Sequence, residues 1–128
     1  MPQAMTAGQK YSLDFQGDQL NDLKFTYSPE TVRSEAVQIS PLGYHPDDPS
    51  KVAFLSTWMG NKGQGLSYKP GQKFWLTDNN GKKVFEGEIE LSKSKQDAED
   101  FLGRNYNKTD VYVADFSNFD KKGNYKVV

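Results

Sequence analysis

The chain offers few side chains for metal or nucleophilic chemistry. His45 is its single histidine, and it contains no cysteine. A zinc site or a Ser-His-Asp triad would therefore depend on His45 for every imidazole, and a cysteine nucleophile is excluded. His45 lies between Tyr44 and Pro46 in a loop-like segment, and we interpret it as a structural or solvent-facing residue. The sequence predicts no metal and no cofactor.

The 17 acidic residues are the remaining candidates for acid–base chemistry. Glycoside hydrolysis needs two carboxylates that flank a sugar, but Glu86, Glu88 and Glu90 alternate along one predicted strand and so share an exposed face. Asp47 and Asp48 could offer oxygen ligands to calcium, although a solvated turn fits their spacing better. Residues 60–65 are glycine-rich but match neither phosphate-loop pattern. We expect no catalytic residue in this chain.

Size and charge narrow the functional class further. A chain of 128 residues suits one domain with a single core. The net charge is −1, from 16 basic and 17 acidic residues, which gives no electrostatic footprint for nucleic acid or an anionic membrane. No apolar run is long enough to span a bilayer, and residues 1–6 lack the features of a signal peptide. We therefore expect neither nucleic acid nor membrane as a partner.

Short strands with turn signals between them dominate the chain. Period-two alternation predicts half-buried strands over residues 10–15 and 23–27, and residues 52–55 form a short apolar run. Asn80-Gly81 predicts a hairpin with a type I′ turn. Residues 94–102 are predicted to make one or two helical turns. The pattern indicates an all-β chain of about seven to nine strands, a sandwich or a small barrel, whose last strand ends the chain as in a module cut from a longer protein.

Three segments carry a resemblance to a known family. The first is Gln38-Ile39-Ser40-Pro41-Leu42-Gly43-Tyr44-His45-Pro46-Asp47-Asp48-Pro49-Ser50-Lys51-Val52-Ala53. The second runs from Phe74 to Gly87 and contains Gly81-Lys82-Lys83-Val84-Phe85-Glu86-Gly87. The third is Tyr112-Val113-Ala114-Asp115-Phe116-Ser117-Asn118-Phe119 followed by Gly123-Asn124-Tyr125. In this order and spacing they resemble the N-terminal immunoglobulin-like (Ig-like) domain of family nine glycoside hydrolases, the cellulase type. The resemblance implies an Ig-like β-sandwich over residues 36–128.

The chain also departs from the family pattern. The family has Asn-Gln just before its Val-Gly-Tyr, where this chain has Ser40-Pro41 followed by Leu42. Residues 60–72 and 92–109 are longer than the family's loops. Residues 1–35 have no counterpart, and we interpret them as an N-terminal extension: either added strands of the same domain or the tail of a preceding module.

Aromatic residues are the best candidates for binding. The resemblance places Phe74 and Leu76 in the core, so Trp75 is expected to face outward. Exposed rings can stack on sugars or anchor an interface, where Trp and Tyr are enriched; the plain alternative is burial under the domain's own loops. The candidates for carbohydrate stacking are Trp58, Tyr68, Trp75 and Tyr106. The candidates for an interface are Tyr44, Trp75, Phe116 and Phe119.

The resemblance implies a non-catalytic accessory module. The family's catalytic carboxylates lie in a helical barrel that follows this domain, so no catalytic residue transfers to this chain. Its expected partner is the catalytic domain of the same polypeptide, which it would pack against and stabilise, with polysaccharide as a second partner. The alternatives are an independent carbohydrate-binding module and a cell-surface adhesion-type sandwich. An extracellular or periplasmic location is expected.

Overall fold

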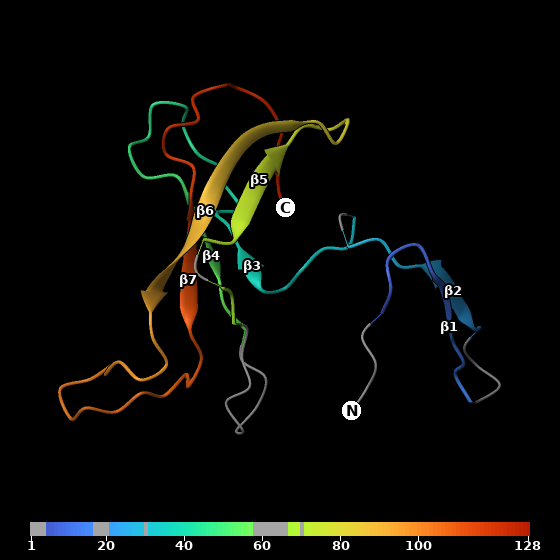
Figure 1. Cartoon of the computed structure of the whole chain (residues 1–128), viewed down its shortest axis with the longest axis horizontal. Helices are drawn as coiled ribbons and strands as arrows, with labels where there is room; N and C mark the ends of the chain where they lie inside the picture. The colour runs from blue at the N-terminus through green and yellow to red at the C-terminus, as the bar shows by residue number, and fades with distance from the viewer. Residues whose placement is uncertain (1–4, 17–20, 30, 58–66, 70) are drawn as a thin grey trace. The chain divides into compact units, whose positions relative to one another are not determined.

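Strands are the regular secondary structure of the described part of the chain. The computed structural model describes residues 5–16, 21–29, 31–57, 67–69 and 71–128, and no helix occurs among them. The strands are β1 (Lys10–Leu13), β2 (Leu23–Thr26), β3 (Val37–Gln38), β4 (Val52–Leu55), β5 (Lys73–Thr77), β6 (Lys83–Lys93), β7 (Val111–Asp115) and β8 (Lys126–Val127) (Figure 1). The all-β prediction is confirmed, with eight strands. Two compact units divide the chain, Met1–Ser34 and Glu35–Val128.

The first unit is built on a two-stranded antiparallel ribbon. β1 and β2 pair only with each other, and Tyr11 lies opposite Phe25 as Leu13 lies opposite Leu23. Because side chains alternate along a strand, these four apolar residues share one face. The Tyr11 and Phe25 rings lie with their centroids 5.9 Å apart. The ribbon therefore has one apolar and one polar face.

The second unit is an antiparallel arrangement in the order β3-β4-β7-β6-β5-β8, consistent with an Ig-like sandwich. β6 pairs with β5 through residues 83–88 and with β7 through residues 89–93. One long curved strand thus serves both halves of the sandwich, as Figure 1 shows. Strands that pass from one sheet to the next commonly do so at a bend.

The core lies inside this second unit and follows strand alternation. Its buried residues are Ala53, Leu55, Phe74, Leu76, Ile89, Tyr112, Ala114 and Phe116. Phe74 and Leu76 are each 2% exposed, whereas Trp75 between them is half-buried on the other face of β5. Gly87, opposite Phe74 in β6, leaves room for the Phe74 ring, since an added Cβ would lie 2.5 Å from the ring atom Cε1.

The β5–β6 hairpin forms as predicted, but its turn type differs. Gly81 has a φ of +78°, whereas a type I′ turn needs positive φ at both central residues. Lys108 is the only non-glycine with positive φ in the described ranges, so the predicted type I′ geometry is wrong. Asp78 instead accepts the N–H of Gly81 through its carbonyl at 3.0 Å and the N–H of Asn80 through its carboxylate at 2.9 Å. Asx hydrogen bonding of this kind favours the observed turn.

The helical turns predicted over residues 94–102 do not form. The Asp97 carboxylate accepts the N–H of Ser94 at 2.8 Å. The Asp100 carboxylate accepts the N–H groups of Leu102 and Arg104, each at 2.9 Å. Side-chain bonds of this kind compete with the helical hydrogen-bond ladder, so the segment folds into a succession of turns.

Candidate functional site

A groove of about 370 Å³ lies at one end of the second unit, between the loop 39–46 and residues 119–127. Three of the predicted interface residues line it: Tyr44, Phe116 and Phe119. We call this feature the end groove. The end groove is formed by two loops that are distant in sequence. Its shape therefore depends on contacts that hold these two loops in position.

Tyr44 is fixed by both ends of its side chain. Gly43, with a φ of +76°, turns the chain immediately before it. The Tyr44 hydroxyl donates to the Val52 carbonyl and accepts the N–H of Ser40 at 3.4 Å. Its ring meets the Phe116 ring edge-on, with centroids 5.4 Å apart. Tyr44 therefore joins the loop to β4 and forms one wall of the end groove.

Lys51 is a residue whose role the sequence patterns left unassigned. It is only 4% exposed, and its ammonium donates to the carbonyls of Pro46 at 2.7 Å and Asp48 at 2.8 Å. A buried charge is tolerated when its donors are satisfied in this way. Its backbone N–H donates to the Ser117 hydroxyl at 3.0 Å, and its carbonyl accepts the N–H of Phe116 at 2.9 Å. The sequence signal that could have indicated this role is the position of Lys51 directly after a proline-rich loop.

The turn after β7 supplies the opposite wall. Asp115 accepts the N–H of Ser117 at 2.8 Å, and the hydrogen bonds from Ser117, aided by the charge of Lys51, lower the pKa of the Asp115 carboxyl. Phe119 lies next, its ring 5.9 Å from Phe85 and 4.8 Å from Tyr125, both edge-on. The predicted folding roles of this segment thus coincide with the shaping of the end groove.

The rim of the end groove is apolar and basic. Ile39 lines it and is 47% exposed. Leu42, between two residues that line it, is 96% exposed. Lys121 and Lys122 also line it, and no carboxylate does so among the described residues.

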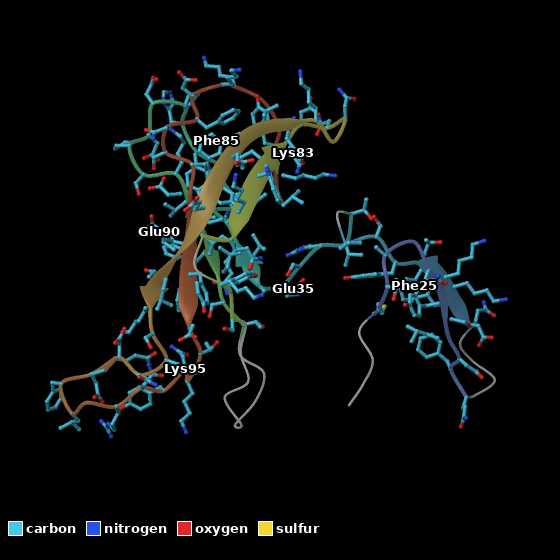
Figure 2. All side chains as sticks on the ribbon, in the orientation of Figure 1. Phe25, Glu35, Lys83, Phe85, Glu90 and Lys95 are labelled. Atoms are coloured by element: carbon cyan, nitrogen blue, oxygen red, sulfur yellow. The ribbon has the colours of Figure 1, made fainter. Side chains whose placement is uncertain are left out.

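Trp75, the fourth interface candidate, does not line the end groove. Its indole N–H donates to Glu86 at 3.0 Å, and the Lys83 ammonium sits 3.6 Å from its ring centroid. Lys73 also bonds Glu86, which raises the pKa of Lys73 and lowers that of Glu86. Figure 2 labels Lys83 near the start of β6, with Glu90 toward its other end. Trp75 thus belongs to a charged surface cluster on the outer face of β5.

The carbohydrate-stacking candidates that the structure describes each have their own separate set of contacts. Trp58 lies outside the described residues. Tyr68 packs edge-on against Tyr112, with ring centroids 5.0 Å apart, and burial raises the pKa of Tyr68. Tyr106 is 58% exposed, but its hydroxyl donates to Asp100 at 2.6 Å. Of the three described candidates, counting Trp75, none lines the end groove.

His45 and the neighbouring Asp47 lie exposed in the loop before β4. The side chains of His45 and Asp47 are 73% and 87% exposed, and His45 Nδ1 accepts the N–H of Asp47 at 3.2 Å. The Asp48 carbonyl, which could have served calcium, already accepts from Lys51. Within the described ranges, no group of three histidine, cysteine or acidic residues is placed to hold a metal ion. The same residues include no helix long and apolar enough to cross a bilayer.

Comparison with known proteins gives one clear result. The profile of the cellulase N-terminal Ig-like domain matches residues 32–128, which contain all three signature segments and the whole end groove. A search of curated proteins found no match to the chain. The matched region is well over half of the 128 residues, and the suspected resemblance is confirmed: the chain belongs to the cellulase N-terminal Ig-like domain family.

Proposed function

We propose that this chain is the non-catalytic accessory module of a cellulase-type glycoside hydrolase, which packs against and stabilises a catalytic domain in the same polypeptide. Membership in the Ig-like domain family supports the class of protein. The observation that carries the proposal is the end groove, where aromatic walls meet an exposed apolar rim. The proposed role implies an extracellular or periplasmic location, which cell fractionation would test.

The rim has the chemistry of a domain interface. Leu42 and Ile39 are 96% and 47% exposed, and covering a fully exposed leucine side chain contributes roughly 1.5–3 kcal/mol. Interfaces between domains of one chain are more polar than obligate ones, and the lysines on this rim suit that character. The half-buried Tyr44 and Phe119 would present fixed aromatic edges to the partner, which lowers the entropy lost on docking.

The proposal is tested in the protein that joins this chain to its downstream catalytic domain. Leu42→Asp is expected to lower the unfolding temperature of the catalytic domain, because a charge would enter the interface. Leu102→Asp is the matched control: Leu102 is also exposed, at 57%, but lies in the loop 94–110, away from the end groove. Equal unfolding temperatures for the two variants would contradict the proposal. The isolated chain is expected to show no hydrolysis of soluble or insoluble glucans.

A further inference from the structure

A second groove lies on the outer face of the β4–β7 pair, the face that points away from the core. Its volume is about 390 Å³, and its lining residues are Gln38, Phe54, Ser56, Thr57, Asn107, Thr109 and Val111. We call it the sheet groove. Phe54 lies between Ala53 and Leu55, which are 0% and 5% exposed in the core, and is itself 43% exposed. Alternation therefore places Phe54 on the outer face, where it pairs in register with Gln38 and Val113.

The Phe54 ring is open for stacking. The other phenylalanines of β5–β7 and the following turn, Phe74, Phe85, Phe116 and Phe119, each contact another ring. No ring or cation contacts Phe54 among the described residues. An aromatic face carries negative charge density, so it attracts the C–H groups that a pyranose ring with equatorial hydroxyls presents on its flat side.

Unused amide and hydroxyl groups surround this ring. The Gln38 amide and the Thr57 hydroxyl form no hydrogen bond with any described side chain or backbone group. Asn107 donates its amide N–H to Glu99 at 2.9 Å, which fixes the side chain and leaves its carbonyl oxygen able to accept. The Ser56 hydroxyl donates to the Asp110 carbonyl at 3.1 Å and keeps its acceptor sites.

The walls of the sheet groove are held in position beyond the ends of the strands. Ser56 bonds across to Asp110, and the Thr109 hydroxyl, in a residue only 7% exposed, donates to the Thr57 carbonyl at 3.2 Å. These two bonds continue the β4–β7 pairing by side chains. The side chains of Ser56, Thr109 and Asn107 are thus held in position, and pre-organisation of such groups reduces the entropy lost on binding.

The absence of charge from this lining selects the ligand class. None of the seven lining residues is acidic or basic, so the lining itself offers no opposite charge to an anionic or cationic ligand. One open aromatic ring with amides and hydroxyls suits a neutral polyol. We propose that the sheet groove binds a neutral oligosaccharide with equatorial hydroxyls, with Phe54 beneath one sugar ring and Gln38, Thr57 and Asn107 bonding its hydroxyls. This inference is independent of the accessory role.

The test is a nuclear magnetic resonance titration of the ¹⁵N-labelled chain. The probes are cellohexaose and chitohexaose, which are neutral and equatorial, with hexagalacturonate as the charged comparison. Binding of a neutral hexamer is expected to shift the backbone amides of residues 54–57 and 107–111. Phe54→Ala is expected to weaken binding at least tenfold. Phe101→Ala is the matched control, since Phe101 is 94% exposed but lies outside the sheet groove, and its affinity is expected to match the unmodified chain.

If Phe54→Ala perturbs the fold, a second variant at the surface of the sheet groove tests the binding proposal instead. Gln38→Ala changes an exposed side chain and is expected to weaken binding several-fold while the spectrum of the free protein stays intact. The proposal is overturned if no neutral hexamer shifts the sheet groove at about 5 mM, a concentration at which even millimolar affinity is visible. It is also overturned if shifts map elsewhere, or if hexagalacturonate binds more tightly than cellohexaose.

Discussion

Single residues explain the stability of the end-groove loops. Lys51→Met would keep the aliphatic stem but remove the ammonium that bonds the carbonyls of Pro46 and Asp48. We expect the free energy of unfolding to fall by about 1–3 kcal/mol, because two part-buried carbonyl acceptors lose their donor. Urea denaturation measures this loss. Lys126→Met, at an exposed position in β8, serves as the control, and an equal change in both variants would refute the structural role of Lys51.

The Tyr44 hydroxyl gives a smaller, separable effect. Tyr44→Phe keeps the ring contact with Phe116 and removes the bonds to Val52 and Ser40. A loss of about 0.5–1.5 kcal/mol in unfolding free energy is expected, with the groove shape retained. A variant as stable as the unmodified chain would show that the hydroxyl contributes nothing.

Gly87 is required by packing and not by its backbone angles. An alanine Cβ would lie 2.5 Å and 2.7 Å from two ring atoms of Phe74, so Gly87→Ala is expected to lose about 1–3 kcal/mol by overpacking. The cost should be smaller in a Phe74→Leu background, which removes the clash. A double-mutant cycle from four denaturation curves measures this coupling. Strict additivity of the two substitutions would rule the clash out.

At the scale of elements, carboxylates organise the long loop 94–110. The pKa of Asp100 is lowered, first by the Tyr106 hydroxyl, and that of Glu99 is lowered, first by the backbone N–H of Tyr106. Because both pKa values are lowered in the folded state, the two ionised carboxylates stabilise the loop fully above their ordinary pKa values of 3.8 and 4.5. This stabilisation is lost as the pH falls through the pKa values that the carboxyl groups have in the folded protein. Figure 2 shows this loop, with Lys95 labelled.

Hydrogen exchange across this pH range tests the loop. The amides of Leu102, Arg104 and Tyr106, which donate to these carboxylates, are expected to lose protection as the pH falls through the lowered pKa values of Asp100 and Glu99, after correction for the intrinsic pH dependence of exchange. The amide of Ala114 in the core strand β7 is the internal reference. If the Ala114 amide loses protection over the same pH range as the loop amides, the opening is not local and does not depend on these carboxylates.

Strands were predicted correctly where the pattern of apolar residues follows from burial in the core. Residues 52–55 become β4, as their short apolar run predicts, and residues 73–77 become β5 with Phe74 and Leu76 in the core, as the resemblance implies. The helical prediction for residues 94–102 was wrong because local spacing does not show that the Asp97 and Asp100 carboxylates accept hydrogen bonds from backbone N–H groups. These bonds replace the ones that a helix would form. β6 continues to Lys93 through a polar stretch, since pairing with β7 supplies hydrogen bonds that no local pattern announces.

The candidate site was predictable only in part, and for a physical reason. Tyr44, Phe116 and Phe119 were identified through the family motifs, and the structure brings them to one groove. Nothing in the spacing shows that Lys51 would bond the Ser117 hydroxyl, 66 residues away in sequence. The sheet groove was missed because Phe54 lies in a continuous apolar run, where only the three-dimensional alternation distinguishes the outer residue.

At the scale of the whole molecule, the second unit contains every residue of the core cluster. A fragment of residues 35–128 is therefore expected to fold by itself, with a single cooperative urea transition. The amide spectrum of its β4, β6 and β7 residues should match that of the complete chain. An unfolded fragment would instead support the interpretation of residues 1–35 as necessary strands of the same domain.

We propose that the end groove receives a catalytic domain of the same polypeptide. The most direct measurement is hydrogen–deuterium exchange by mass spectrometry, comparing the isolated chain with the protein that joins it to the catalytic domain. We expect slower exchange in peptides from residues 39–46 and 119–127 of the joined protein, with the loop 94–110 unchanged. Identical exchange of the end-groove peptides in both proteins would contradict it.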